Sequence, residues 1–247
     1  MIKKIYDKSE LGFSIIWIIA YVILASLADS LSEEIGISKI ITLPVLIILS
    51  ILLLYFVKKN GYIKYYGLCK SEIPLPKMLF YFPLIILLTA NLWYGVALNT
   101  SILETILYIL SMFCVGFLEE MIFRGFLFKA MAKDNIKSAI IVSSVTFGIG
   151  HIVNLINGSG AELLPNLLQV IYAMAIGFTF VIIFHKTKSL LVCIVTHGIF
   201  NGLSAFANEA ALSNSKQIIS GILITLIPLS YALYITLAFK EKKSIEI

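Results

Sequence analysis

Long apolar runs, separated by short polar connections, constrain the fold of this chain more than any other feature. A helix needs about 20 mostly apolar residues to cross the hydrocarbon core of a bilayer. Eight runs approach or exceed that length: residues 11–31, 40–57, 78–98, about 105–132, 138–156, 163–184, 189–207 and 217–239. They are continuous and lack the alternation of membrane barrel strands. Since 60% of the residues are hydrophobic and only 13% are charged, we predict an all-α polytopic membrane protein with eight transmembrane helices.

The same runs leave no stretch long and polar enough for a separate soluble domain. We therefore expect a single membrane domain over residues 1–247. The apolar run after MIKKIYDKSE is too long for a signal-peptide core and lacks a small-residue cleavage site, which indicates a retained first helix. Three scattered cysteines without metal-type spacing are typical of free thiols: Cys69, Cys114 and Cys193.

The basic residues predict the orientation of the chain. If the eight helices alternate across the bilayer, all of the 19 Lys and Arg residues except Lys39 and Lys216 lie on one side. Because cytoplasmic loops carry an excess of Lys and Arg, we expect a multi-pass protein of the cell membrane with both termini in the cytoplasm. The net charge of +5 comes from these loop clusters, so the expected partner is the lipid bilayer and not nucleic acid.

Polar and ionisable residues interrupt three of the predicted spans. They are Glu119, Glu120 and Arg124 in FLEEMIFRGF (117–126), His151 in FGIGH, and His197 with Asn201 in HGIFN. Charged groups within a span are costly and mark functional sites by default. At about 1.5 Å of rise per residue, Glu119 and His151 lie about 21 Å from the cytoplasmic ends of their helices, and His197 and Asn201 about 14 and 20 Å. We therefore expect these four side chains in one layer of the bilayer.

Helical spacing predicts different roles for the two glutamates. Glu120 and Arg124 are four residues apart with the acid first, which favours an ion pair along the helix and makes their burial tolerable. Glu119 is rotated by about 100° from Glu120, so we expect the two carboxylates to face different targets. Glu119 is left without a cation on its own helix and is the candidate general base.

The remaining groups suit the hydrolysis of an amide bond. His197 and Asn201 are also four residues apart, so both side chains can donate to one developing oxyanion. His151 would orient the attacking water or return a proton to the leaving amine. In this hypothesis Glu119 takes the proton of the water, and no covalent nucleophile is needed.

The three motifs resemble those of a known family. EEMIFRG (119–125), FGIGH (147–151) and HGIFN (197–201) are similar, in order and spacing, to the EExxxR, FxxxH and HxxxN motifs of the CAAX-processing and bacteriocin-processing (CPBP, or Abi) intramembrane proteases. The resemblance implies an eight-helix bundle with a catalytic core at about 105–207. It implies Glu119 and His151 as catalytic residues, His197 and Asn201 as oxyanion donors, and a membrane-anchored peptide or protein as substrate.

Cofactor and biological role stay open in the sequence. Glu119, His151 and His197 are the candidate ligands if zinc binds, but HExxH is absent and a Glu–His pair can activate water unaided, so we expect no metal. The resemblance would suit bacteriocin or signal-peptide maturation, or self-immunity. The alternatives are a proton-coupled transporter, which would need a polar track across the bilayer, and a non-catalytic immunity or scaffold protein.

Overall fold

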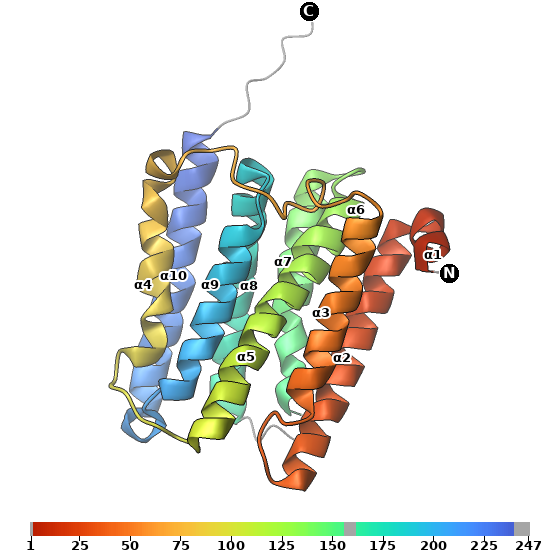
Figure 1. The fold of residues 1–247 in the computed structure, drawn as a ribbon. Helices are drawn as coiled ribbons and strands as arrows, with labels where there is room; N and C mark the ends of the chain where they lie inside the picture. The colour runs from red at the N-terminus through yellow and green to blue at the C-terminus, as the bar shows by residue number, and fades with distance from the viewer. Residues whose placement is uncertain (1, 156–161, 240–247) are drawn as a thin grey trace, which may run out of the picture.

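The computed structural model describes residues 2–155 and 162–239, which form a bundle of helices (Figure 1). Its α-helices are α1 (Ile2–Lys8), α2 (Glu10–Ile35), α3 (Thr42–Lys59), α4 (Phe82–Leu88), α5 (Ile102–Glu119), α6 (Lys129–Met131), α7 (Ile136–Gly150), α8 (Leu163–Thr187), α9 (Leu191–Leu203) and α10 (Asn214–Ala238). Seven helical stretches among the described residues are long and apolar enough to cross a membrane: Glu10–Ile35, Thr42–Lys59, Leu75–Leu92, Ile102–Met131, Ile136–Leu155, Leu163–Thr187 and Asn214–Ala238. The predicted all-α, polytopic membrane fold is confirmed.

The span predicted at 189–207 is shorter than expected. Its apolar helix, Leu191–Phe206, is shorter than the other spans, each of which has at least 18 residues. Its last turn is a 3₁₀ turn, η5 (Ser204–Phe206). The chain leaves α8 at Lys188 in a left-handed conformation with φ of 57°, and the next two residues connect to α9. Because part of the apolar run forms this connection, the number of apolar residues in the run overestimates the length of the helix.

The span predicted at 78–98 is not one continuous α-helix. α4 lies between two 3₁₀ segments, η1 (Leu75–Tyr81) and η2 (Ala90–Leu92). The backbone before α4 passes through the left-handed region at three consecutive residues, which are Leu79, Phe80 and Tyr81. Such residues cannot continue a right-handed helix, so this span is built from short pieces.

The helices are arranged around a central group. α4 and α10 lie at one side of the bundle, α2 and α3 at the other, and α5, α7, α8 and α9 lie between them (Figure 1). α5 packs against α9 and α3, and α7 packs against α8. The three helices that carry the polar motifs, α5, α7 and α9, therefore all belong to the central group.

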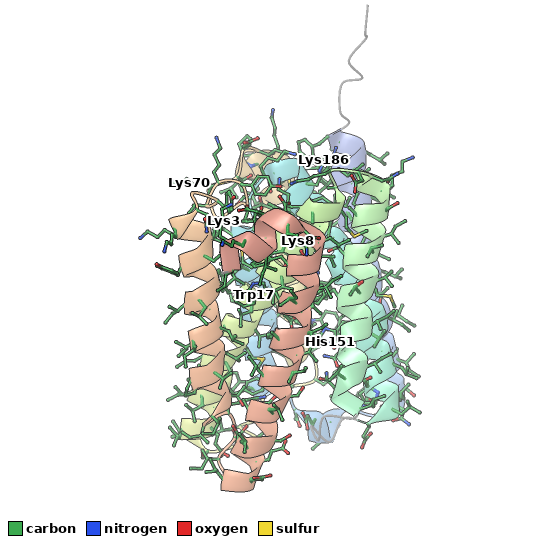
Figure 2. The ribbon with its side chains drawn as sticks, turned by 90° about the vertical axis from the view of Figure 1, so that its right-hand side faces the viewer. Lys3, Lys8, Trp17, Lys70, His151 and Lys186 are labelled. Atoms are coloured by element: carbon green, nitrogen blue, oxygen red, sulfur yellow. The ribbon has the colours of Figure 1, made fainter. Side chains whose placement is uncertain are left out.

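The two ends of the bundle differ in charge. Lys3, Lys8, Lys70 and Lys186 share one end (Figure 2), which we call the lysine-rich end, and α10 finishes there as well (Figure 1). The opposite, lysine-poor end holds the connection between α2 and α3, which contains Lys39.

Residue 156 of the predicted fifth span and three of the basic residues used to predict orientation lie outside the described residues: Lys240, Lys242 and Lys243.

Candidate active site

The EExxxR motif lies where the helix changes type. Glu119 is the last residue of α5, and Glu120 begins a π-helix, η3 (Glu120–Phe128), whose residues are all buried. π-helical turns are rare and occur frequently at functional sites. Because a π-helix is wider than an α-helix, the directions of side chains after Glu119 depart from those expected of a regular α-helix.

Glu120 and Arg124 form an ion pair inside the bundle. Arg124 Nη1 lies 3.0 Å from Glu120 Oε1, and both side chains are fully buried. The guanidinium carbon of Arg124 also lies 3.9 Å from the ring centroid of Phe147, in a cation–π contact that compensates for the loss of water. The arginine is thus enclosed by an acid and an aromatic face.

His197 lies between the two carboxylates. Its Nδ1 lies 2.9 Å from Glu120 Oε1, and its Nε2 lies 3.5 Å from Glu119 Oε2. Our expectation that Glu119 and Glu120 would face different targets is therefore wrong. Imidazole has a nitrogen on each of two edges, so two carboxylates that diverge by a wide angle can still reach the same ring.

Two glycines allow α5 and α9 to approach closely enough for this contact. A Cβ added to Gly116 on α5 would lie 2.7 Å from the backbone nitrogen of Gly198 on α9. This distance is too short for any side chain, so the two backbones meet directly, as small residues permit in membrane helices. The close approach positions His197, next to Gly198, against the end of α5.

Tyr21 on α2 is a site residue that sequence reasoning missed. Its hydroxyl donates a hydrogen bond of 2.7 Å to Glu119 Oε1 across 98 positions of sequence, and its side chain is buried. No motif contains it. Depth in the membrane is the signal that could have found it. Tyr21 follows Lys8 by 13 residues, or about 20 Å of helix, which is close to the depth expected for Glu119. A buried tyrosine hydroxyl also needs a polar partner.

His151 joins two cavities beside these groups. It is the C-cap of α7 and the first residue of a 3₁₀ turn, η4 (His151–Leu155). Asn166 Nδ2 on α8 donates a hydrogen bond of 2.9 Å to His151 O. A cavity of about 140 Å³ is lined by His151 together with Glu119 and Tyr21. A smaller cavity of about 40 Å³ is lined by His151 together with His197 and Asn201.

Phe147 lies between the two histidines. Its ring centroid lies 5.4 Å from that of His151 and 5.7 Å from that of His197, each edge to face. The structure thus gathers the four predicted residues around one aromatic ring, with Glu119 and His197 in contact and with His151 and Asn201 lining the adjoining cavities.

The candidate metal ligands do not form a metal site as they are arranged. In residues 2–155 and 162–239, no three His, Cys, Asp or Glu side chains are grouped so that they could hold a metal ion. Glu119 and His197 converge, but His197 already contacts Glu120 through Nδ1, and His151 lies across Phe147. As arranged, these side chains do not supply the three protein ligands of a catalytic zinc.

A comparison with family models identifies the central segment. The model described as type II CAAX prenyl endopeptidase Rce1-like matches residues 100–203. These residues form an Rce1-like domain. The match includes all three motifs, overlaps the core expected at 105–207, and confirms the resemblance to the CAAX-processing proteases. No curated protein and no solved structure was found to match the chain.

The match supports a likeness of residues 100–203 to the CAAX-type intramembrane proteases, and the polytopic fold agrees with it. Tyr21 lies outside the matched residues. The hydroxyl bound to Glu119 therefore comes from a part of the chain that the family model does not describe.

Proposed function

We propose that this chain is an intramembrane endopeptidase that hydrolyses a peptide bond of a membrane-associated peptide or protein. The observation that carries the proposal is the surroundings of Glu119. Its carboxylate accepts a hydrogen bond from Tyr21, lies 3.5 Å from His197 Nε2, and lines a cavity together with His151. A carboxylate held in place beside a cavity has the arrangement that a general base for water requires.

In this mechanism Glu119 removes a proton from water. Tyr21 holds Oε1, whereas Oε2 is buried and has no hydrogen bond within the described residues. Oε2 is therefore the oxygen that would take the proton from a water admitted to the cavity. The water oxygen bonds to the carbonyl carbon of the substrate, and the carbonyl oxygen becomes an oxyanion. When the tetrahedral intermediate collapses, the C–N bond breaks and the proton passes through Glu119 or His151 to the leaving amine.

The oxyanion would be bound by His197 and Asn201. Glu120 accepts from the Nδ1 side of His197, which leaves Nε2 as the nitrogen that faces Glu119 and the substrate. When His197 is protonated, the charges of His197, Arg124 and the two glutamates sum to zero, and Nε2–H is a donor. Preorganised donors of this kind stabilise the charge that develops in the transition state.

The transporter alternative would require ionisable groups that continue from the site to both ends of the bundle. On the lysine-rich side of Glu119, the buried ionisable groups of η3 end at Arg124, and the residues that follow Gly125 are buried and apolar: Phe126, Leu127 and Phe128. This apolar stretch favours a localised reaction centre over a proton path. Maturation of a bacteriocin or signal peptide, or self-immunity, is the biological role that we propose for such a centre.

A cleavage assay with matched variants tests the proposal. The purified full chain in detergent is incubated with a library of random decapeptides, and cleavage is read by mass spectrometry. We expect Glu119→Gln to lower the rate by about 10²–10⁴-fold, the range for a lost general base. Glu104→Gln, on the same helix, is the control because glutamine also completes the helix cap that Glu104 makes with Ser101. Cleavage that survives in Glu119→Gln would refute the proposed base.

A further inference from the structure

The bundle is closed over the candidate site on its lysine-rich side. Six aromatic residues, which we call the aromatic cluster, pack between the site and that end: Tyr6, Phe13, Trp17, Phe56, Tyr66 and Phe126. Phe13 lies 4.9 Å from Phe56 and 5.1 Å from Phe126, centroid to centroid. Figure 2 shows Trp17 between the lysines of this end and the level of His151.

The aromatic cluster is closely packed, and five of its six residues are buried. The Tyr66 hydroxyl donates to the Tyr6 hydroxyl at 2.8 Å, and both rings are at most 5% exposed. Burial raises the pKa of both phenols, as expected where the phenolate would be poorly solvated. Close packing of these rings opposes the passage of a peptide through this side of the bundle.

The side toward the lysine-poor end is hollow and polar. Tyr21, Ala25 and Asp29 follow one another at four-residue intervals on α2, and all three line the cavity of about 140 Å³. From Tyr21 to Asp29 the helix rises about 12 Å, away from the lysine-rich end. The cavity that starts at Glu119 therefore extends along α2 toward the connection between α2 and α3.

The far part of this cavity is open to solvent. Lys39 Nζ lies 2.8 Å from Asp29 Oδ1, and their side chains are 18% and 27% exposed. Both residues line the cavity, as does Ser26. An ion pair that is part-exposed at the end of a cavity indicates that water enters there. Figure 2 shows His151 on this half of the bundle, between α2 and α7.

From this asymmetry we propose that the substrate reaches Glu119 from the lysine-poor end, as a peptide segment on the extracytoplasmic side of the membrane. The direction follows from the positive-inside rule, which places the lysine-rich end in the cytoplasm. The substrate class is then a translocated peptide, or the outer end of a membrane-anchored one, and a protein-export reaction must supply it. The inference about substrate rests on the proposed function.

Cysteine accessibility tests the direction independently of catalysis. In a chain with Cys69→Ser, Cys114→Ser and Cys193→Ala, one variant carries Ser26→Cys in the cavity wall and a control carries Lys70→Cys at the lysine-rich end. Intact bacterial cells and permeabilised cells are treated with a small, impermeant cationic methanethiosulfonate. We expect the cysteine at 26 to react in intact cells and the cysteine at 70 to react only after permeabilisation. The reverse pattern, or a cysteine at 26 that never reacts, would overturn the proposal.

Sided vesicles separate this proposal from the proposed function. The random decapeptide library is added to right-side-out vesicles, to inside-out vesicles and to detergent-solubilised protein. Cleavage in detergent and in right-side-out vesicles, but not in inside-out vesicles, supports entry from the extracytoplasmic side. Cleavage in detergent and in inside-out vesicles, but not in right-side-out vesicles, would refute that entry. The proposed protease function would still hold. Absence of cleavage in all three samples would refute the proposed function, and the labelling pattern would still decide the direction.

Discussion

Glu119 and Glu120 are neighbours in the chain, but the regions on the two sides of the His197 ring are opposite in character. On the Nδ1 side, Glu120 is fully buried against Arg124, which is itself covered by Phe147. On the Nε2 side, Glu119 is held by the Tyr21 hydroxyl and lines a cavity. The first region is closed and charge-compensated, and the second borders a cavity.

This difference shows how one dipeptide can supply a structural and a reactive carboxylate. A fully buried carboxylate paired with a guanidinium balances the charge of that group, but it cannot reach a substrate. A carboxylate at the wall of a cavity can exchange a proton with water or substrate that enters the cavity. The His197 imidazole connects the two regions, so the closed side fixes the orientation of the ring that the open side uses.

The largest expected effect on stability comes from the closed side. Glu120→Gln leaves Arg124 buried without its acid, and we expect a loss of about 3–5 kcal/mol in the free energy of unfolding. Glu119→Gln should change stability far less. Thermal unfolding in detergent measures both. The double variant Glu120→Gln/Arg124→Met removes both charges and should be more stable than Glu120→Gln alone. If Glu119→Gln and Glu120→Gln lower the stability equally, the claim that only Glu120 has a structural role would be contradicted.

The next effect concerns the contact that brings His197 to the glutamates. Gly116→Ala forces α5 away from the backbone of Gly198, and we expect it to cost about 1–3 kcal/mol as overpacking and to lower cleavage. Gly202→Ala, at the same pair of helices, is the control because its added Cβ would lie 3.7 Å from Ile109 Cγ2, an ordinary contact. Unfolding and cleavage are measured on both variants. If Gly116→Ala behaves like Gly202→Ala, close approach of the backbones is not required.

A smaller effect is expected on the open side at Tyr21. Tyr21→Phe removes the hydrogen bond to Glu119, and we expect kcat to fall about tenfold with KM unchanged, the low end for a bond to a charged group. Tyr231→Phe is the matched control, because the Tyr231 side chain is also buried and its hydroxyl donates at 2.7 Å to Met78 O, far along the chain from the motifs. A similar fall in both variants would indicate a general packing defect rather than orientation of Glu119.

The smallest effect is predicted for metal removal. Because His197 is held between two carboxylates and no three-ligand group is assembled in the described part of the chain, treatment with a chelator should leave the rate of peptide cleavage unchanged. The assay is repeated after zinc is added back. A loss of cleavage that zinc restores would show that a metal takes part and that the arrangement around Glu119 changes when it binds.

Most of the fold could be predicted from the sequence because apolar length alone requires membrane-spanning helices. The length of α9 could not, since an apolar run also supplies the residues of a tight connection. The positions of Glu119, His151, His197 and Asn201 on neighbouring helices followed from motif order and from depth. Their roles remain predictions.

The geometry around His197 could not be predicted from periodicity. The direction of Glu120 depends on a change from α- to π-helix, which spacing on a regular helix does not describe. The Tyr21 contact joins residues 98 positions apart, and a single tyrosine in an apolar run gives no motif. Both features depend on how the helices pack, and this includes the backbone contact of Gly116 with Gly198.

The central claim is that Glu119 and His197 act together on one reaction inside the membrane. A double-mutant cycle on peptide cleavage, with wild type, Glu119→Gln, His197→Gln and the double variant, tests it most directly. Groups that act as a unit are strongly non-additive, so we predict that the double variant cleaves no more slowly than Glu119→Gln alone. A double variant whose loss equals the product of the two single losses, or a Glu119→Gln variant that cleaves at the wild-type rate, would contradict the claim.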